Sequence, residues 1–191
     1  MQKPIIIETS ARHVHLSRED LDILFGEDYE LKKKKDLSQP GQFACMEQVK
    51  VIGPKGRVTA TILGPIRPET QVELSLTDAR AIGVKPPVRE SGDTAGSPGC
   101  KLIGPMGEVT IEQGVIAAKR HIHATPAEAQ RYNLKDKQIV QVKYGGENRN
   151  IIYGDVVVRV RPDFALAMHI DTDESNAGRV ASGALGEILA D

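Results

Sequence analysis

Four of the five histidines lie in two copies of one short motif. Residues 12–17 and 120–125 share the pattern Arg-His-apolar-His-x-hydroxyl, where the hydroxyl belongs to Ser17 or Thr125. The copies are 108 residues apart, since 121 − 13 and 123 − 15 give the same difference. Imidazole nitrogens are common ligands of zinc and other transition metals. The repeat therefore predicts two metal-binding half-sites.

An extended strand would aim both histidines of a pair at one ion. Side chains alternate along a strand, so the two rings of His-x-His lie on the same side, with Cα atoms about 6–7 Å apart. Both rings could then reach one metal ion at about 2.0–2.1 Å. The residue between them, Val14 or Ile122, faces the other way and is expected to anchor the strand in a core.

A short helix is expected after each pair. Ser17 and Thr125 are preferred N-cap residues, and proline follows Thr125 at the tolerated first helical position. Glu128 completes a capping box, for which Asp20 is a shorter substitute in the first copy. These signals predict helices over 18–25 and 126–132.

Both parts of the motif have alternative interpretations. A single His-x-His often only packs in a core, but repeated packing does not require imidazole at both positions. Arg12 and Arg120 precede the pairs and could contact phosphate, contact a carboxylate, or remain solvated. The sequence leaves these three roles open.

Each half-site needs a third ligand, because catalytic zinc usually takes three protein ligands and keeps one position open. His169 is the remaining histidine and lies on the apolar run 165–170. The other ligand must be a carboxylate or a cysteine, which spacing alone does not select. Glu73 is a candidate because it is an acid within the strand-like run 71–76. Arg67, on a rigid turn just before it, could hold an anion.

Composition excludes several functional classes. The formal net charge is −1, so nothing indicates nucleic-acid binding, and no apolar run is long enough to span a membrane. Cys45 and Cys100 have no metal-type spacing and indicate a reduced, cytosolic protein with two inert thiols.

The remaining pattern is mostly short strands. Gly-Pro turns at 53–56 and 104–107 predict two hairpins, and strands are expected at 138–144, 150–153, 156–160 and 164–170. Thr77 is expected to cap a helix over 77–82, and Asp171 or Thr172 one ending near 176. The aperiodic segment 86–99 could be a linker, a mobile active-site loop or a surface loop. This pattern favours small β-barrels with short helices.

These motifs resemble one protein family. The segments 9–17, 64–67, 120–123 and 168–174 are similar to those of the PduL-type phosphotransacylases (phosphate propanoyltransferases), and the resemblance extends over essentially the whole chain. It implies exchange of coenzyme A for inorganic phosphate on a short-chain acyl-CoA.

The resemblance also implies a set of site residues. Two zinc ions would share the active site, one on His13, His15 and Glu73 and the other on His121, His123 and His169. Arg67 matches the family's phosphate-binding arginine. Coenzyme A contacts would fall at Thr9, Ser10, Ala11, Lys55 and Asn176.

The fold implied is mainly β, with two small barrels capped by short helices. The first strand would join the C-terminal barrel, so that residues 1–10 and 119–191 form one domain and 11–118 the other. Thr61 stands where relatives usually carry a basic coenzyme A contact. The first motif begins near Met1 without an amphipathic extension, so we expect a cytoplasmic enzyme rather than one in a microcompartment lumen. Its oligomeric state stays open, a homodimer included.

Our mechanistic hypothesis is direct attack of phosphate on the thioester carbonyl. Arg67 and the three-histidine zinc would hold phosphate, and the other zinc would act as a Lewis acid. Two rival functions are a two-zinc hydrolase acting on a thioester or phosphate substrate, and a metal-stabilised binding module without turnover.

Overall fold

The computed structural model describes residues 3–145 and 148–189, which divide into two compact units. The barrel unit contains residues 3–10, 38–40 and the described part of the chain from 119 onward. The open-sheet unit contains residues 11–37 and 41–118. Residues 1–2, 146–147 and 190–191 of the predicted domains lie outside the described residues.

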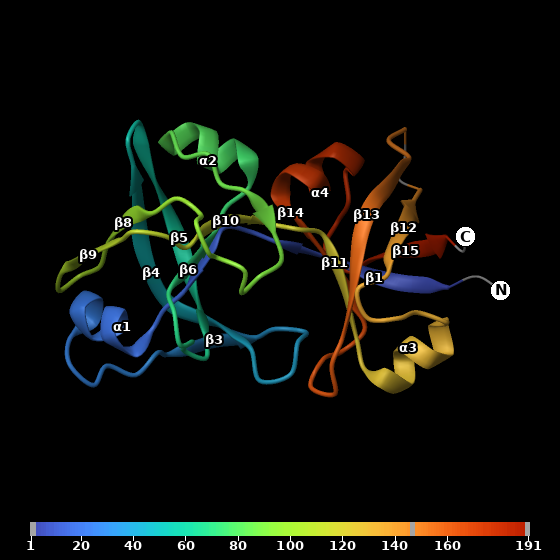
Figure 1. The fold of residues 1–191 in the computed structure, drawn as a ribbon, viewed down its shortest axis with the longest axis horizontal. Coiled ribbons are helices and arrows are strands. Elements are labelled where there is room, and N and C mark those ends of the chain that lie inside the picture. Colours follow the sequence, from blue (N-terminus) through green and yellow to red (C-terminus); the bar gives the residue numbers. More distant parts are fainter. Residues whose placement is uncertain (1–2, 146–147, 190–191) are drawn as a thin grey trace. The chain divides into compact units, whose positions relative to one another are not determined.

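The barrel unit is a closed six-stranded barrel (Figure 1). Its order is β1-β14-β11-β13-β12-β15, so the first strand closes a barrel otherwise built from the C-terminal part of the chain, as predicted. Two short helices, α3 (Pro126–Tyr132) and α4 (Thr172–Gly178), follow β11 and β14. The strands are β1 (Pro4–Ser10), β11 (His121–Ala124), β12 (Ile139–Tyr144), β13 (Ile151–Val160), β14 (Ala167–Asp171) and β15 (Ala184–Leu189).

The open-sheet unit has the order β7-β10-β6-β2-β5-β4-β8-β9, with β3 added beside β4. Among the described residues this sheet has two free ends, so it is a half-barrel rather than a second closed barrel. Its helices are α1 (Arg18–Phe25) and α2 (Leu76–Ile82). Its strands are β2 (His13–His15), β3 (Lys33–Asp36), β4 (Phe43–Gly53), β5 (Gly56–Gly64), β6 (Gln71–Glu73), β7 (Val88–Arg89), β8 (Cys100–Ile103), β9 (Glu108–Ile111) and β10 (Val115–Ala118).

Both units arrange the strands around the histidine pair in the same way. In one, β2 runs antiparallel to β6 and parallel to β5, with His13 opposite Glu73. In the other, β11 runs antiparallel to β14 and parallel to β13, with His121 opposite His169. The third residues are 96 positions apart (169 − 73), whereas the pairs are 108 apart. This difference explains why only part of the repeat is visible in the sequence.

Each histidine pair is anchored from behind by its central residue. Val14 and Ile122 have no exposed surface, and each lies in the hydrophobic core of its own unit. The predicted strand geometry of His-x-His is therefore confirmed in both copies. The hairpins at 53–56 and 104–107 and the helices at 18–25 and 126–132 are confirmed as well.

Four local predictions were wrong. Helix α2 begins at Leu76, because the Ser75 hydroxyl, not Thr77, caps it. Strand β13 is continuous through Gly154, with a local irregularity at Asp155, whose φ is 52°. Strand β14 begins only at Ala167. Asp20 accepts a hydrogen bond from the Thr70 hydroxyl instead of closing a capping box.

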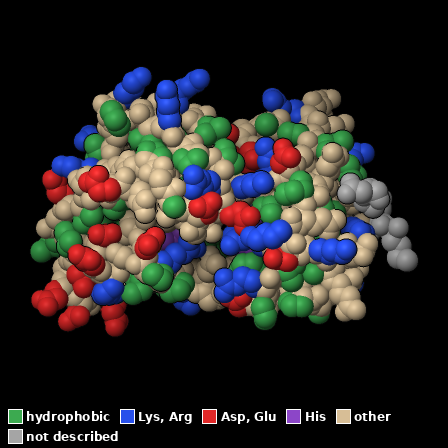
Figure 2. All heavy atoms as spheres, viewed as in Figure 1, with side chains coloured by type: hydrophobic (Ala, Val, Ile, Leu, Met, Phe, Trp, Pro, Cys, Tyr) green, Lys and Arg blue, Asp and Glu red, His purple; other side chains and the backbone are tan. Residues whose placement is uncertain are grey.

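The surface agrees with the near-zero net charge. On the face drawn in Figure 2, acidic and basic side chains are interspersed, and hardly any histidine surface is visible. Within residues 3–145 and 148–189, no helix is long and apolar enough to cross a membrane.

Candidate metal centres

The first candidate centre is formed by His13, His15 and Glu73 in the open-sheet unit. All three side chains are buried, and one potential ligand atom from each lies within 4.8 Å of the others. His13 Nε2 lies 3.3 Å from Glu73 Oε2. Two ligands of a tetrahedral zinc ion, each about 2.0–2.1 Å from the metal, are about 3.3 Å apart. This part of the cluster already has the spacing that zinc would require.

The rings of this pair are held so that each offers one nitrogen. His13 Nδ1 donates a hydrogen bond to the Ala11 carbonyl at 2.9 Å, which leaves Nε2 as the ligand atom of the neutral ring. His15 Nδ1 is buried and has no hydrogen-bond partner. A buried, unpartnered polar atom is costly, and a metal ion would satisfy it.

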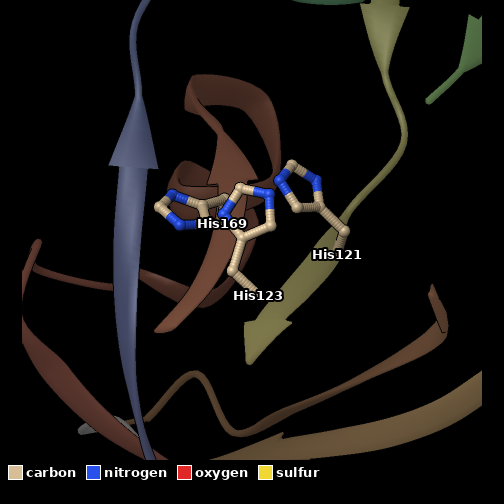
Figure 3. Close-up of side chains that lie close together, drawn as sticks. All are labelled: His121, His123 and His169. Atoms are coloured by element: carbon tan, nitrogen blue, oxygen red, sulfur yellow. The ribbon is translucent and has the colours of Figure 1, made fainter. Parts of the chain in front are cut away.

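The second candidate centre is formed by His121, His123 and His169 in the barrel unit. The first two project from β11 and the third from the neighbouring strand β14, and the three rings gather together (Figure 3). Ring centroids are 4.5 to 5.2 Å apart. His121 Nδ1 donates to the Lys119 carbonyl at 2.8 Å, and His123 Nδ1 is buried without a partner. The arrangement of the first centre is thus repeated.

His169 has additional polar neighbours within its own unit. Its Nδ1 lies 3.6 Å from Glu8 Oε2, and its Nε2 lies 3.4 Å from the Gln39 side-chain nitrogen. Gln39 in turn exchanges two hydrogen bonds with the backbone of Ala165, at 3.0 and 3.1 Å. Both ring nitrogens of His169 therefore have a polar side chain of the same unit nearby.

The electrostatics favour neutral imidazole at the second position of each pair. Burial, with a smaller contribution from His13, lowers the pKa of His15 to about 3. Burial and the two neighbouring histidines also lower the pKa of His123. For His13, burial lowers the pKa, but the Glu73 carboxylate outweighs this and raises it. Burial raises the pKa of Glu73, and the adjacent His13 more than reverses this.

Both clusters fit zinc in the kinds of donor atom that they present. Imidazole nitrogen and carboxylate oxygen are usual zinc ligands, and three protein ligands leave a position for a substrate. Two buried, unpartnered nitrogens, one in each cluster, support the same conclusion. The donor sets differ in charge, since only the first contains a carboxylate.

Arg67 lies beside the first cluster. Its backbone N–H donates to the Leu16 carbonyl at 2.9 Å, and its Nη1 donates to Ser91 Oγ at 3.1 Å. Its positive charge contributes to lowering the pKa of His15. The guanidinium is therefore close enough to act on an anion bound near this cluster.

The arginines of the repeated motif contact carboxylates. Arg12 Nη1 lies 2.9 Å from Asp78 Oδ1, and Arg120 Nε lies 2.7 Å from Glu174 Oε1. Each acid is five residues beyond the third member of its triad (78 − 73 and 174 − 169) and lies in the helix that follows. Each arginine thus ties that helix to the start of the histidine strand, so the carboxylate contact is the one of the three proposed roles that the structure contains.

The expected coenzyme A contacts are distributed over both units. Thr9 and Ser10 end β1, and Asn176 is exposed on α4 of the barrel unit. Ala11 supplies the carbonyl that orients His13, and exposed Lys55 lies in the β4–β5 turn of the open-sheet unit. Their role in binding coenzyme A stays a prediction.

Thr61 lies on β5 opposite His13, and its hydroxyl accepts a weak hydrogen bond from Gln48 at 3.5 Å. Whether this position contacts coenzyme A stays a prediction too.

The residues that support Glu73 were not predicted from the sequence. Gln71 and Ser91 both hydrogen-bond to Glu73 Oε1, at 2.6 and 2.8 Å. Gln71 is buried next to Glu73 on β6, and Ser91 comes from the aperiodic segment 86–99. The only signal in the sequence was the length of that segment.

A mainly β fold with two triads of possible metal ligands, all buried except the half-buried His169, defines a protein with two candidate metal centres. A model of the phosphate propanoyltransferase family matches residues 6–181, a range that includes both triads and Arg67. The chain belongs to this family, and the resemblance found in its motifs is confirmed. Membership of this family identifies the chain as an acyltransferase.

Similar proteins support the same assignment. Phosphate propanoyltransferases of Thermotoga maritima, Listeria monocytogenes and Enterococcus faecalis are 56%, 51% and 53% identical to it. The alignments cover 97%, 99% and 98% of this chain and 89% of each relative.

Proposed function

We propose that the chain exchanges coenzyme A for inorganic phosphate on short-chain acyl-CoA substrates such as acetyl- or propanoyl-CoA. The products would be an acyl phosphate and free coenzyme A, and the reaction would be reversible. The observation that carries the proposal is the family match over residues 6–181, a range that contains both triads of possible metal ligands.

Two zinc ions are part of the proposal. His13, His15 and Glu73 would hold one, and His121, His123 and His169 the other. When bound, zinc supplies Lewis-acid stabilisation of negative charge on substrate oxygen or sulfur. Glu73 lowers the net charge of the first centre relative to the all-histidine centre, so the two would differ in their attraction for anions.

Arg67 would bind and orient phosphate. A guanidinium forms charge-assisted, often paired hydrogen bonds with phosphate oxygens. A phosphate oxygen would attack the thioester carbonyl carbon, the C–S bond would break, and coenzyme A would leave as the thiolate. The backbone at Thr9, Ser10 and Ala11, with Lys55 and Asn176, would contact coenzyme A.

Direct attack is favoured over a covalent acyl-enzyme because the candidate thiol nucleophiles are inactive. Burial raises the pKa of Cys45 to about 11 and that of Cys100 to about 12, so neither is a thiolate near neutral pH. We therefore expect sequential kinetics. Ping-pong kinetics would contradict direct attack.

A two-zinc hydrolase would use the same ligands to activate water. The two functions are separated by incubating the protein with propanoyl-CoA, with and without phosphate. Free thiol and hydroxamate-trapped acyl phosphate would be measured together. We expect thiol release that requires phosphate and matches the acyl phosphate formed, whereas equal release of free acid without phosphate would establish the hydrolase.

The role of Arg67 is tested by its substitution with alanine. We expect Arg67→Ala to raise the KM for phosphate about tenfold or more, while the KM for acyl-CoA changes little. Arg67→Lys keeps the charge but loses the planar fork of the guanidinium. Its KM for phosphate should therefore lie between those of the wild type and Arg67→Ala. An Arg67→Ala enzyme with unchanged phosphate dependence would refute the role.

A further inference from the structure

Ser91 joins two groups to which the proposed function gives separate tasks. Its hydroxyl donates to Glu73 Oε1 at 2.8 Å and accepts from Arg67 Nη1 at 3.1 Å. It also accepts from the Gln71 side-chain nitrogen at 2.8 Å. One donated and two accepted bonds use the full capacity of a hydroxyl group. The orientation of the Ser91 hydroxyl is therefore fixed, with its hydrogen directed at the Glu73 carboxylate.

Gln71 holds this arrangement in place. It is buried, and its amide nitrogen donates to both Ser91 Oγ and Glu73 Oε1. Its amide oxygen accepts from the backbone N–H of Gly92 at 2.7 Å. The segment that carries Ser91 is thus fastened to β6 through side chain and backbone together.

The network assigns different tasks to the two oxygens of Glu73. Oε1 accepts from Gln71 and Ser91, whereas Oε2 lies 3.3 Å from His13 Nε2. One oxygen is held by neighbours, and the other is directed into the candidate metal centre. Hydrogen bonds of this kind to a ligating carboxylate commonly tune metal affinity.

We propose that Ser91 is a positioning residue that couples Arg67 to Glu73, so that one hydroxyl orients both the phosphate-binding guanidinium and the carboxylate ligand of the first metal centre. The inference rests on the proposed function of these two residues. It predicts that removal of the Ser91 hydroxyl disturbs phosphate binding and metal binding together.

Ser91 does not fit the role of a nucleophile. A serine nucleophile needs a base that is free to take its proton. The only carboxylate shown to accept the Ser91 hydrogen is Glu73, whose other oxygen is directed at the metal centre. The hydroxyl is therefore better suited to hold its neighbours than to attack a substrate.

The chain offers a matched control in Ser97. This serine lies on the same segment 86–99, is buried where Ser91 is half-buried, donates to the Thr94 carbonyl at 2.7 Å, and accepts from Gly114 N–H at 2.9 Å. These contacts involve neither Arg67 nor Glu73. Ser97→Ala therefore removes a comparable hydroxyl from the same segment without touching the proposed coupling.

The test compares the wild type with Ser91→Ala, Ser91→Thr, Ser97→Ala, Arg67→Ala and the Arg67→Ala/Ser91→Ala double variant. Zinc affinity is measured by chelator competition, and KM values are measured for phosphate and propanoyl-CoA. For Ser91→Ala we expect about tenfold weaker binding at one of two zinc equivalents. The KM for phosphate should rise about fivefold, the effect of one hydrogen bond, with little change for propanoyl-CoA.

The remaining variants isolate the coupling. Ser91→Thr should restore both properties, and Ser97→Ala should alter neither. In the double variant, phosphate KM should equal that of Arg67→Ala alone, because Ser91 acts on phosphate through Arg67.

Several outcomes would overturn the inference. Unchanged zinc affinity in Ser91→Ala, or a Ser91 effect on phosphate KM that persists undiminished without Arg67, would do so. A loss of kcat above a thousandfold, with zinc affinity and both KM values intact, would indicate a nucleophile instead.

If Arg67→Ala leaves phosphate KM unchanged, the proposed function of Arg67 fails. The zinc affinity of Ser91→Ala then still tests, on its own, whether Ser91 orients Glu73.

Discussion

Within each histidine pair, the two rings differ in the hydrogen bonding of their Nδ1 atoms. The first histidine donates Nδ1–H to a carbonyl two residues earlier, at Ala11 or Lys119, and thereby presents Nε2. The second has a buried, unpartnered Nδ1. Because this division occurs in both units, it is a property of the motif rather than of one site.

The two cysteines should be unreactive in the native protein. Their raised pKa values, about 11 and 12, leave little thiolate at pH 8, and both side chains are buried. We expect slow reaction with a disulfide reagent at pH 8 and rapid reaction of both thiols in denaturant. Fast labelling of the folded chain would show that the β4 or β8 region opens readily.

The sequence predicted the candidate histidine ligands better than the residues that hydrogen-bond to Glu73. The pairs were recognisable because the motif occurs twice with one spacing. Gln71 and Ser91 are 20 residues apart and meet only because the segment after β7 folds back onto β6. No local periodicity records such a contact, so the sequence alone did not reveal it.

Short helices follow the strands of both triads, and their capping residues determine where they begin. Helices α3 and α4 have complete capping boxes, formed by Thr125 with Glu128 and by Asp171 with Glu174. The predicted start of α2 failed because Ser75 and Thr77 are both good caps. Only the fold shows that Ser75 has the extended conformation an N-cap needs, with ψ at 160°.

The capping box of α3 should make stability depend on pH. Burial raises the pKa of Glu128, but hydrogen bonds from the Thr125 backbone and side chain outweigh this and lower it. A lowered folded-state pKa means that the stabilisation is present above the ordinary glutamate value of 4.5 and is lost as pH falls through the folded value.

Comparing wild type with Glu128→Gln by urea unfolding tests this dependence. We expect the wild type to be more stable at pH 7 and the difference to shrink as the pH falls below 4.5. A difference that stays constant from pH 7 to pH 4 would contradict ionic capping by Glu128.

The Arg120–Glu174 pair should matter more than a surface ion pair. The Arg120 guanidinium also lies 5.7 Å from the Tyr153 ring, and the Tyr153 hydroxyl donates to the Glu174 carbonyl at 2.7 Å. We expect Arg120→Ala to lower the free energy of unfolding by about 1–2 kcal/mol. Arg161→Ala, which breaks an exposed pair with Asp163, should cost less than about 0.5 kcal/mol. If the two substitutions lower the free energy of unfolding equally in denaturant titrations, the Arg120–Glu174 pair is worth no more than a surface ion pair.

For the molecule as a whole, the two units share a strand arrangement but differ in closure. The mainly β class followed from short strands and frequent turns. Which sheet closes into a barrel could not be predicted in this way, because closure depends on pairings between strands far apart in sequence, such as Pro4 opposite Glu187. In the other unit, β7 and β9 pair on one side only among the described strands, and the sheet remains open.

Metal removal should destabilise the whole protein if both triads bind zinc. Each triad comes from two neighbouring strands of its own unit, and an ion that binds only the folded state stabilises that state. At a free zinc concentration 100 times Kd, each site would add about 2.7 kcal/mol. We expect two zinc equivalents per chain by elemental analysis, a lower Tm after chelation and recovery on adding zinc. An unchanged Tm in a fully stripped protein would argue against both sites.

The position of β1 has a consequence for the order in which the protein folds during synthesis. This strand is synthesised before all the strands of the open-sheet unit, whereas its two neighbours, β14 and β15, are synthesised after them, and Glu8 lies opposite His169. Residues 11–118 can pair their strands while translation continues, whereas the N-terminal strand must wait with both edges exposed. Until then it can pair with another nascent chain. We therefore expect this protein to be most prone to misassembly in the interval between synthesis of β1 and synthesis of β14 and β15.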